Sequence, residues 1–157
     1  MSATPVSATD AATAVFARLG GDLVDPPTLM PAALPLELSG EAVRARLCVF
    51  ANGDGHEQAL RPDLTLPVAQ AEADARAAGT TTGETVARYA ARAFRLPSER
   101  GLPVEFTQVG FERFGAASDA ATDAETFALV SEAADAAGVT RGTAWFGDLS
   151  IFPAFVD

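Results

Sequence analysis

The alternating segment from Val104 to Glu112 contains the side chains best placed to bind a ligand. Successive side chains of a β-strand point to opposite faces, so every second residue shares a face. One face of this segment carries an amide and a carboxylate, Gln108 and Glu112, separated by Gly110, which adds no side chain. The pattern therefore predicts the floor of a small polar pocket rather than an ordinary core strand.

The segment 88–95 alternates as well, and the polar loop 96–103 that follows it predicts a β-hairpin with the segment above. In this hairpin Ala91 pairs with Gln108, which brings the two faces together. Small alanines leave space between the strands, and Arg95 closes one end of that space.

A ligand with both a carboxylate and an ammonium group suits such a site. An arginine offers a bidentate fork to the carboxylate, while the acid and the amide accept hydrogen bonds from the ammonium. The alternation alone slightly favours a simpler alternative, an edge hairpin whose polar residues face water.

Two separated segments, Leu60–Thr65 and 94–112, resemble the catalytic core of class II histidyl-tRNA synthetases. They are still more similar to a paralogue of these enzymes, the regulatory subunit of ATP phosphoribosyltransferase, which serves the first step of histidine biosynthesis. The similarity covers most of the chain. Asp25-Pro26-Pro27 resembles the proline region of motif 1, and 88–115 resembles motif 2. Gly147-Asp148-Leu149 is similar to a strand of the regulatory family.

The resemblance implies that six positions bind histidine: Asp63, Leu64, Thr65, Arg95, Gln108 and Glu112. In the family pattern, Asp63, Thr65 and Gln108 would hold the α-amino group, Arg95 the carboxylate and Glu112 the imidazole. Asp63 is one methylene shorter than the synthetase glutamate. Helix capping alone would also explain Asp63 and Thr65, and a cap and a ligand site are compatible at one helix N-terminus.

The departures from the synthetase pattern indicate the regulatory branch. Synthetases have a glutamate where this chain has Pro97, and an arginine-rich run that grips the ATP phosphates where this chain has 101–106, which lacks arginine. The resemblance thus implies a non-catalytic subunit without a cofactor, which binds L-histidine, self-associates as class II cores do, and assembles with the short-form ATP phosphoribosyltransferase catalytic subunit. Two alternatives stay open: a histidyl-tRNA synthetase core fragment that retains histidine binding or adenylation, and a histidine-binding module or inert fragment without a partner.

Composition restricts the partners. With 157 residues, 48% hydrophobic and 20% charged, the chain is expected to form one domain, residues 1–157, with a loose tail at 1–6. A net charge of −10 argues against binding of nucleic acid. The chain has no basic, apolar leader and no run near the ~20 apolar residues that span a bilayer, so no membrane association and a cytoplasmic location are expected. Family segments expected beyond Asp157 make the domain incomplete at the C-terminus.

Capping residues, glycines and prolines indicate where the helices and strands around the polar residues begin and end. The expected class is α+β, an antiparallel sheet flanked by helices, with the class II synthetase-like fold implied by the resemblance. Helices are expected from a cap at Ser7 or Thr9 to Gly20, from a cap at Thr65 to Gly79, and from Asp119 or Asp123 to Gly138. The last should pack through one face made of Phe127, Val130, Ala134 and Ala137.

The remaining segments are expected to be extended. The proline-rich segment 22–38 cannot be an interior helix, and 44–51 with 56–61 should form a hairpin around an Asn-Gly-Asp-Gly turn. The segment 142–152 should be a final strand whose Trp145-Phe146 pair lies in the core, or marks a partner surface if exposed. No metal site is expected from Asp54, His56 and Glu57, because a lone histidine at a hairpin tip usually faces solvent.

Overall fold

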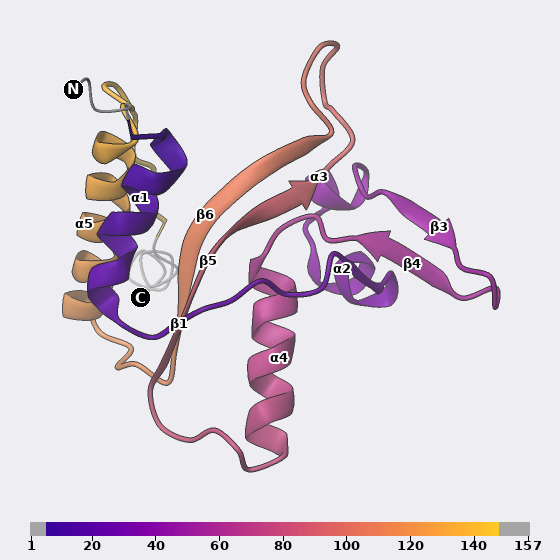
Figure 1. Cartoon of the computed structure of the whole chain (residues 1–157), viewed down its shortest axis with the longest axis horizontal. Coiled ribbons are helices and arrows are strands. Elements are labelled where there is room, and N and C mark those ends of the chain that lie inside the picture. Colours follow the sequence, from indigo (N-terminus) through magenta and orange to yellow (C-terminus); the bar gives the residue numbers. More distant parts are fainter. Residues whose placement is uncertain (1–5, 148–157) are drawn as a thin grey trace, which may run out of the picture.

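The computed structural model describes residues 6–147, which form two small β-sheets flanked by helices (Figure 1). The larger sheet has the strand order β1 (Asp22–Leu23), β5 (Thr85–Phe94) and β6 (Glu105–Phe114), and the smaller has the order β2 (Leu29–Pro31), β4 (Glu57–Leu60) and β3 (Val49–Ala51). Neighbouring strands pair antiparallel except β1, which runs parallel to β5. The predicted α+β class with helices around antiparallel strands is confirmed.

The helices in the described part of the chain are α1 (Ala8–Phe16) with a following 3-10 turn η1 (Ala17–Leu19), α2 (Ala33–Leu38), α3 (Glu41–Arg44), α4 (Thr65–Ala77) and α5 (Ala120–Ala136). Helices α1, α5 and α4 cover the larger sheet, whereas α2 packs against the smaller one. Figure 1 shows α1 and α5 side by side on one face and α4 on the opposite face. No helix in the described part of the chain is long and apolar enough to cross a membrane.

Side-chain caps fix the start of the two helices on the α1–α5 face. The Ser7 hydroxyl accepts a hydrogen bond from the Asp10 amide at 3.1 Å, and an Asp119 carboxylate oxygen accepts one from the Thr122 amide at 2.8 Å. These bonds satisfy amides that have no partner within the helix. Of the two alternatives predicted for each cap, the structure selects Ser7 and Asp119.

The packed face of α5 differs from the predicted one. Ala133 is buried with Phe16 of α1, whereas Phe127 and Val130 are 46% and 49% exposed. Leu129 and the predicted Ala137 also pack against this cluster, so α5 meets α1 through a different set of residues from the predicted one. The prediction that Phe127 and Val130 pack inward is wrong.

Two short helices replace parts of the segments predicted to be extended. Within 22–38, α2 contains Pro35, which is tolerated in the first turn because an amide there has no partner within the helix. Arg44, the predicted start of a strand, instead ends α3, and the strand begins at Val49. The hairpin of β3 and β4 itself is confirmed.

The predicted strand 142–152 is not observed where the structure describes it. Residues 142–147 have no regular secondary structure, and 148–152 lie outside the described residues, as do 1–5 of the predicted tail and most of the segment 147–149. Trp145 and Phe146 are 91% and 78% exposed, so their predicted place in the core is wrong. The ring centroid of Phe146 lies 5.0 Å from that of Phe127 on α5.

A buried arginine joins the two sheets. Arg61, at the end of β4, is 3% exposed and is the one charged residue buried in the described part of the chain. Its guanidinium donates to the carbonyl of Arg92 in β5 at 2.7 Å, to the carbonyl of Pro26, and to the Asp25 carboxylate at 3.0 Å. Its own carbonyl accepts from the Phe94 amide at 3.0 Å. Arg61 therefore holds the residues that follow it against the end of β5.

We expect Arg61→Met to lower the free energy of unfolding by about 3 kcal/mol, because the carbonyls of Arg92 and Pro26 lose their buried donor. Urea unfolding followed by circular dichroism measures the change. Arg44→Met is the matched control: Arg44 has an exposed side chain that lies 3.7 Å from Glu41, and its loss should change stability by no more than about 0.5 kcal/mol. Equal effects of the two substitutions would contradict the structural role of Arg61.

Candidate functional site

The hairpin of β5 and β6 has the predicted register. Ala91 pairs with Gln108, and the Arg95 amide donates to the carbonyl of Val104 at 2.8 Å at the end of the hairpin next to the loop. Gln108 and Glu112 therefore share one face of the sheet, the face toward α4, while Val109 and the other odd-numbered residues of β6 face α1 and α5. The hairpin thus presents an amide and a carboxylate on the same side.

The N-terminus of α4 lies against this face. Leu64 is fully buried, and its amide donates to Gln108 Oε1 at 3.2 Å. The Thr65 hydroxyl donates to Glu112 Oε1 at 2.7 Å. These bonds bring four of the six predicted ligand residues into one hydrogen-bonded group.

The N-cap position of α4 is Leu64, and the side chain that bonds to its first turn is Asp63 rather than Thr65. An Asp63 carboxylate oxygen accepts from the Leu66 amide at 3.0 Å, whereas the Thr65 side chain makes no capping bond. The prediction that Thr65 caps this helix is therefore wrong, because its hydroxyl is turned toward Glu112. Asp63 has a structural role that does not require a ligand.

Arg95 lies beside this group at the end of β5. Its Nε donates to the carbonyl of Pro62 at 2.7 Å, and its guanidinium carbon lies 5.4 Å from the centroid of the Phe106 ring. The backbone bond and the aromatic face orient the guanidinium. No described residue accepts from its two terminal nitrogens, which form the fork that could bind a carboxylate.

Tyr89 is part of the site and was not predicted as one of its residues. Its hydroxyl donates to Glu112 Oε1 at 2.9 Å and accepts from Gln108 Nε2 at 3.5 Å, and the residue is only 4% exposed. Tyr89 pairs with Gly110, where an added Cβ would lie 2.7 Å from the tyrosine oxygen. A glycine between two polar residues of one strand face was the sequence feature that could have indicated this close approach.

The environment of Tyr89 favours its neutral form. Burial first, and then the negative charge of Glu112 and its hydrogen bond, raise the pKa of Tyr89 to about 12. The hydroxyl therefore remains a donor to the Glu112 carboxylate throughout the physiological range of pH.

A cavity of about 310 Å³ adjoins the apolar side of this group. Its wall includes Val68 of α4, Ala87 of β5 and Phe114 of β6, which also pack around Tyr89 or Leu64. Polar groups reach it from Glu72 and Asp25. No three residues of the metal-ligating types come together anywhere in the described part of the chain.

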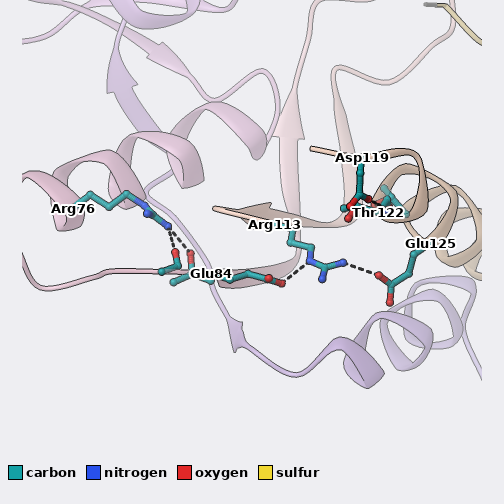
Figure 2. A network of polar contacts seen from close by, with 9 residues as sticks. Arg76, Glu84, Arg113, Asp119, Thr122 and Glu125 are labelled. Atoms are coloured by element: carbon teal, nitrogen blue, oxygen red, sulfur yellow. Dashed lines mark hydrogen bonds and ion pairs between the residues drawn. The ribbon is translucent and has the colours of Figure 1, made fainter. Parts of the chain in front are cut away.

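A second polar network holds the end of the hairpin away from its loop, where β5 begins and β6 ends (Figure 2). Arg113 of β6 bonds to Glu84 at 2.6 Å and to Glu125 of α5 at 2.7 Å, which joins α5 to the start of β5. Arg76 of α4 bonds to the Gly83 carbonyl at 2.8 Å. The carboxylates hold the pKa of Arg113 above its ordinary value. This network is satisfied within the fold, so we assign it a structural role.

Comparisons with known proteins point to one family. A sequence model described as histidyl-tRNA synthetase matches residues 5–157. The ATP phosphoribosyltransferase regulatory subunit of Brucella ovis is 36% identical over 107 residues, which are 68% of this chain and 27% of that protein. The chain thus spans about a quarter of the length of the curated relatives that it matches.

Two solved structures share the fold. One, from Bacillus halodurans, is described as an ATP phosphoribosyltransferase regulatory subunit/histidyl-tRNA synthetase; it aligns with a TM-score of 0.71 and 25% identity over 85% of this chain and 34% of its own. The other, a histidine–tRNA ligase subunit from Alicyclobacillus acidocaldarius, aligns with a TM-score of 0.69 and 26% identity over 83% of this chain and 37% of its own. Similarity to both supports the class II synthetase-like fold that the motifs implied.

The single tyrosine of the chain allows a direct test of this polar group. We expect the tyrosinate absorbance of the folded protein to rise with a midpoint near pH 12, against about 10 for the urea-unfolded chain. Because the folded pKa is the higher one, the stabilisation from the neutral hydroxyl is complete below about pH 10 and is lost as the pH rises toward 12.

Glu112→Gln should lower the midpoint, since the charge of Glu112 raises the Tyr89 pKa. Glu125→Gln, which removes a carboxylate from the Arg113 network, is the control and should leave the midpoint unchanged. A folded midpoint equal to that of the unfolded chain would show that Tyr89 is not enclosed beside Glu112.

Proposed function

The chain belongs to the histidyl-tRNA synthetase family, and we propose that it is a non-catalytic regulatory member of it. In this proposal the chain serves as a regulatory subunit of ATP phosphoribosyltransferase, a glycosyltransferase, in the first step of L-histidine biosynthesis and in feedback by histidine. The observation that carries the proposal is the pairing of the polar group of Leu64, Thr65, Gln108 and Glu112 with a loop that lacks the arginines of the synthetase pattern. The name of the Brucella ovis relative supports the regulatory assignment.

The polar group has the composition needed for an amino-acid zwitterion. The free fork of Arg95 suits the α-carboxylate, and the oxygens of Gln108 and Glu112 suit the cationic or N–H-bearing parts of the ligand. Following the family pattern, we assign the α-amino group to Asp63, Thr65 and Gln108, and the imidazole to Glu112.

The same hairpin is poorly equipped for ATP. The run 101–106 contains no arginine, and Arg92, near the loop, is paired with Glu105 across the strands. Transfer to or from a nucleotide phosphate depends on cations that offset the charge developing on the phosphate. The net charge of −10 likewise disfavours tRNA as a partner.

A histidine site without nucleotide chemistry can act by reporting the level of histidine to another enzyme. Such coupling requires a second subunit and a different affinity for histidine in its two states. We therefore propose the short-form catalytic subunit of ATP phosphoribosyltransferase as the partner, L-histidine as the ligand and self-association of the chain as in class II cores.

The match to the histidyl-tRNA synthetase sequence model favours a second candidate, a synthetase core that still forms histidyl-adenylate. The two candidates differ in one reaction. A synthetase core catalyses histidine-dependent exchange between ATP and pyrophosphate, and a regulatory subunit does not.

For the ligand, we expect Arg95→Ala and Gln108→Ala each to weaken histidine binding about ten- to a hundredfold, the value of one charge-assisted contact of about 1.5–3 kcal/mol. Titration followed by NMR detects affinities as weak as the millimolar range. Arg44→Ala and Gln70→Ala, which remove the same groups from exposed positions, are the matched controls. Equal histidine affinity in the wild type and both site variants would refute the assignment.

For the partner, we expect a larger complex when the chain is mixed with the short-form catalytic subunit, with activity or histidine sensitivity above that of the catalytic subunit alone. Size-exclusion chromatography with light scattering measures the complex. The same preparation should show no histidine-dependent pyrophosphate exchange above background, because the 101–106 run has no arginine. Separate components together with clear exchange would establish the synthetase alternative instead.

A further inference from the structure

We propose that Tyr89 is a positioning residue of the ligand site: it holds Glu112 by one carboxylate oxygen and so presents the other oxygen to the ligand. The inference rests on the proposed histidine site and adds a residue to it. It concerns a side chain that is buried behind the site and acts through Glu112 and Gln108.

The two oxygens of Glu112 have different surroundings. Thr65 donates to Oε1 at 2.7 Å and Tyr89 donates to the same oxygen at 2.9 Å. No described residue donates to Oε2. An ionised carboxylate accepts through both oxygens, so the unpaired Oε2 is the one left for a donor on the ligand.

Tyr89 is the rigid member of this pair of donors. Thr65 lies at the exposed start of α4, whereas Tyr89 is 4% exposed and packs with Leu64 and Val68. Its ring lies over Gly110, where no side chain larger than hydrogen fits, since an added Cβ would approach the ring carbons to 2.8 Å. The hydroxyl position is thus set by the core rather than by the surface.

The same hydroxyl also contacts the second polar side chain. Gln108 Nε2 lies 3.5 Å from the tyrosine oxygen, and Gln108 Oε1 is held by the Leu64 amide at 3.2 Å. Tyr89 therefore contacts both side chains proposed to meet the ligand and limits their rotation before binding. Side chains that are already oriented lose less conformational freedom when the ligand binds, which strengthens binding.

The test is a double-mutant cycle of Tyr89→Phe and Glu112→Gln, with histidine affinity measured by NMR titration of the 157-residue chain. Tyr89→Phe keeps the ring over Gly110 and removes only the hydroxyl. We expect it to weaken histidine binding roughly two- to tenfold, the effect of one neutral hydrogen bond. In the Glu112→Gln background the same substitution should have a smaller effect, because the Glu112 carboxylate is gone and only the 3.5 Å contact with Gln108 remains.

Thr126→Val is the control for loss of a partly buried hydroxyl: its hydroxyl bonds within α5 to the Thr122 carbonyl at 2.9 Å, on the other face of the sheet. It should leave histidine affinity unchanged in both backgrounds. A measurement on the wild type adds a readout that needs no variant: histidine at Glu112 should change the ultraviolet difference spectrum of the single tyrosine.

Three results would overturn the inference. An equal loss from Tyr89→Phe with and without the Glu112 carboxylate would indicate a general packing role. Unchanged affinity in Tyr89→Phe, together with weakened binding in Glu112→Gln, would reject the role of Tyr89 while the histidine site stands. Absence of histidine binding in the wild type would reject the proposed site, and this inference with it.

Discussion

The register of the β5–β6 hairpin is the constraint on which the rest of the structure depends. Pairing of Ala91 with Gln108 turns the amide and the carboxylate of β6 toward α4 and turns Val109 and Phe111 toward α1 and α5. A slip of one residue would exchange the two faces, burying the polar side chains against the helices and exposing the apolar ones. The cost of unpaired buried polar groups makes that alternative unfavourable, so one pattern specifies both the core and the site.

The hairpin supplies Gln108 and Glu112 of the polar group. The rest comes from the start of α4, which Arg61 helps to hold in place. Its guanidinium and carbonyl join the end of β4 to β5, and the chain then passes through Pro62 to the start of α4. Leu64 enters the core there and donates its amide to Gln108. Because Arg95 also bonds to the Pro62 carbonyl, the segment that begins the helix and the arginine beside the site are held together.

The site combines recognition groups with little positive charge. Its acceptors are satisfied on one side by Tyr89, Thr65 and Leu64, which leaves defined atoms for a ligand. The adjoining loop has no arginine in 101–106, so the site is matched to a small zwitterion better than to a nucleotide. The proposed regulatory role requires only differential binding of a ligand, without bond-making.

Local rules were enough to predict the alternating hairpin, the β3–β4 turn and the motifs that resemble one family, and they narrowed the caps of α1 and α5 to two residues each. Tertiary structure decided which side chains meet. The outward face of α5, the exposure of Trp145 and the helix around Pro35 depend on packing between distant segments, which helix and strand periodicity does not report. Tyr89 belongs to the same class, because its role arises only when β5 lies on β6 and brings its ring over Gly110.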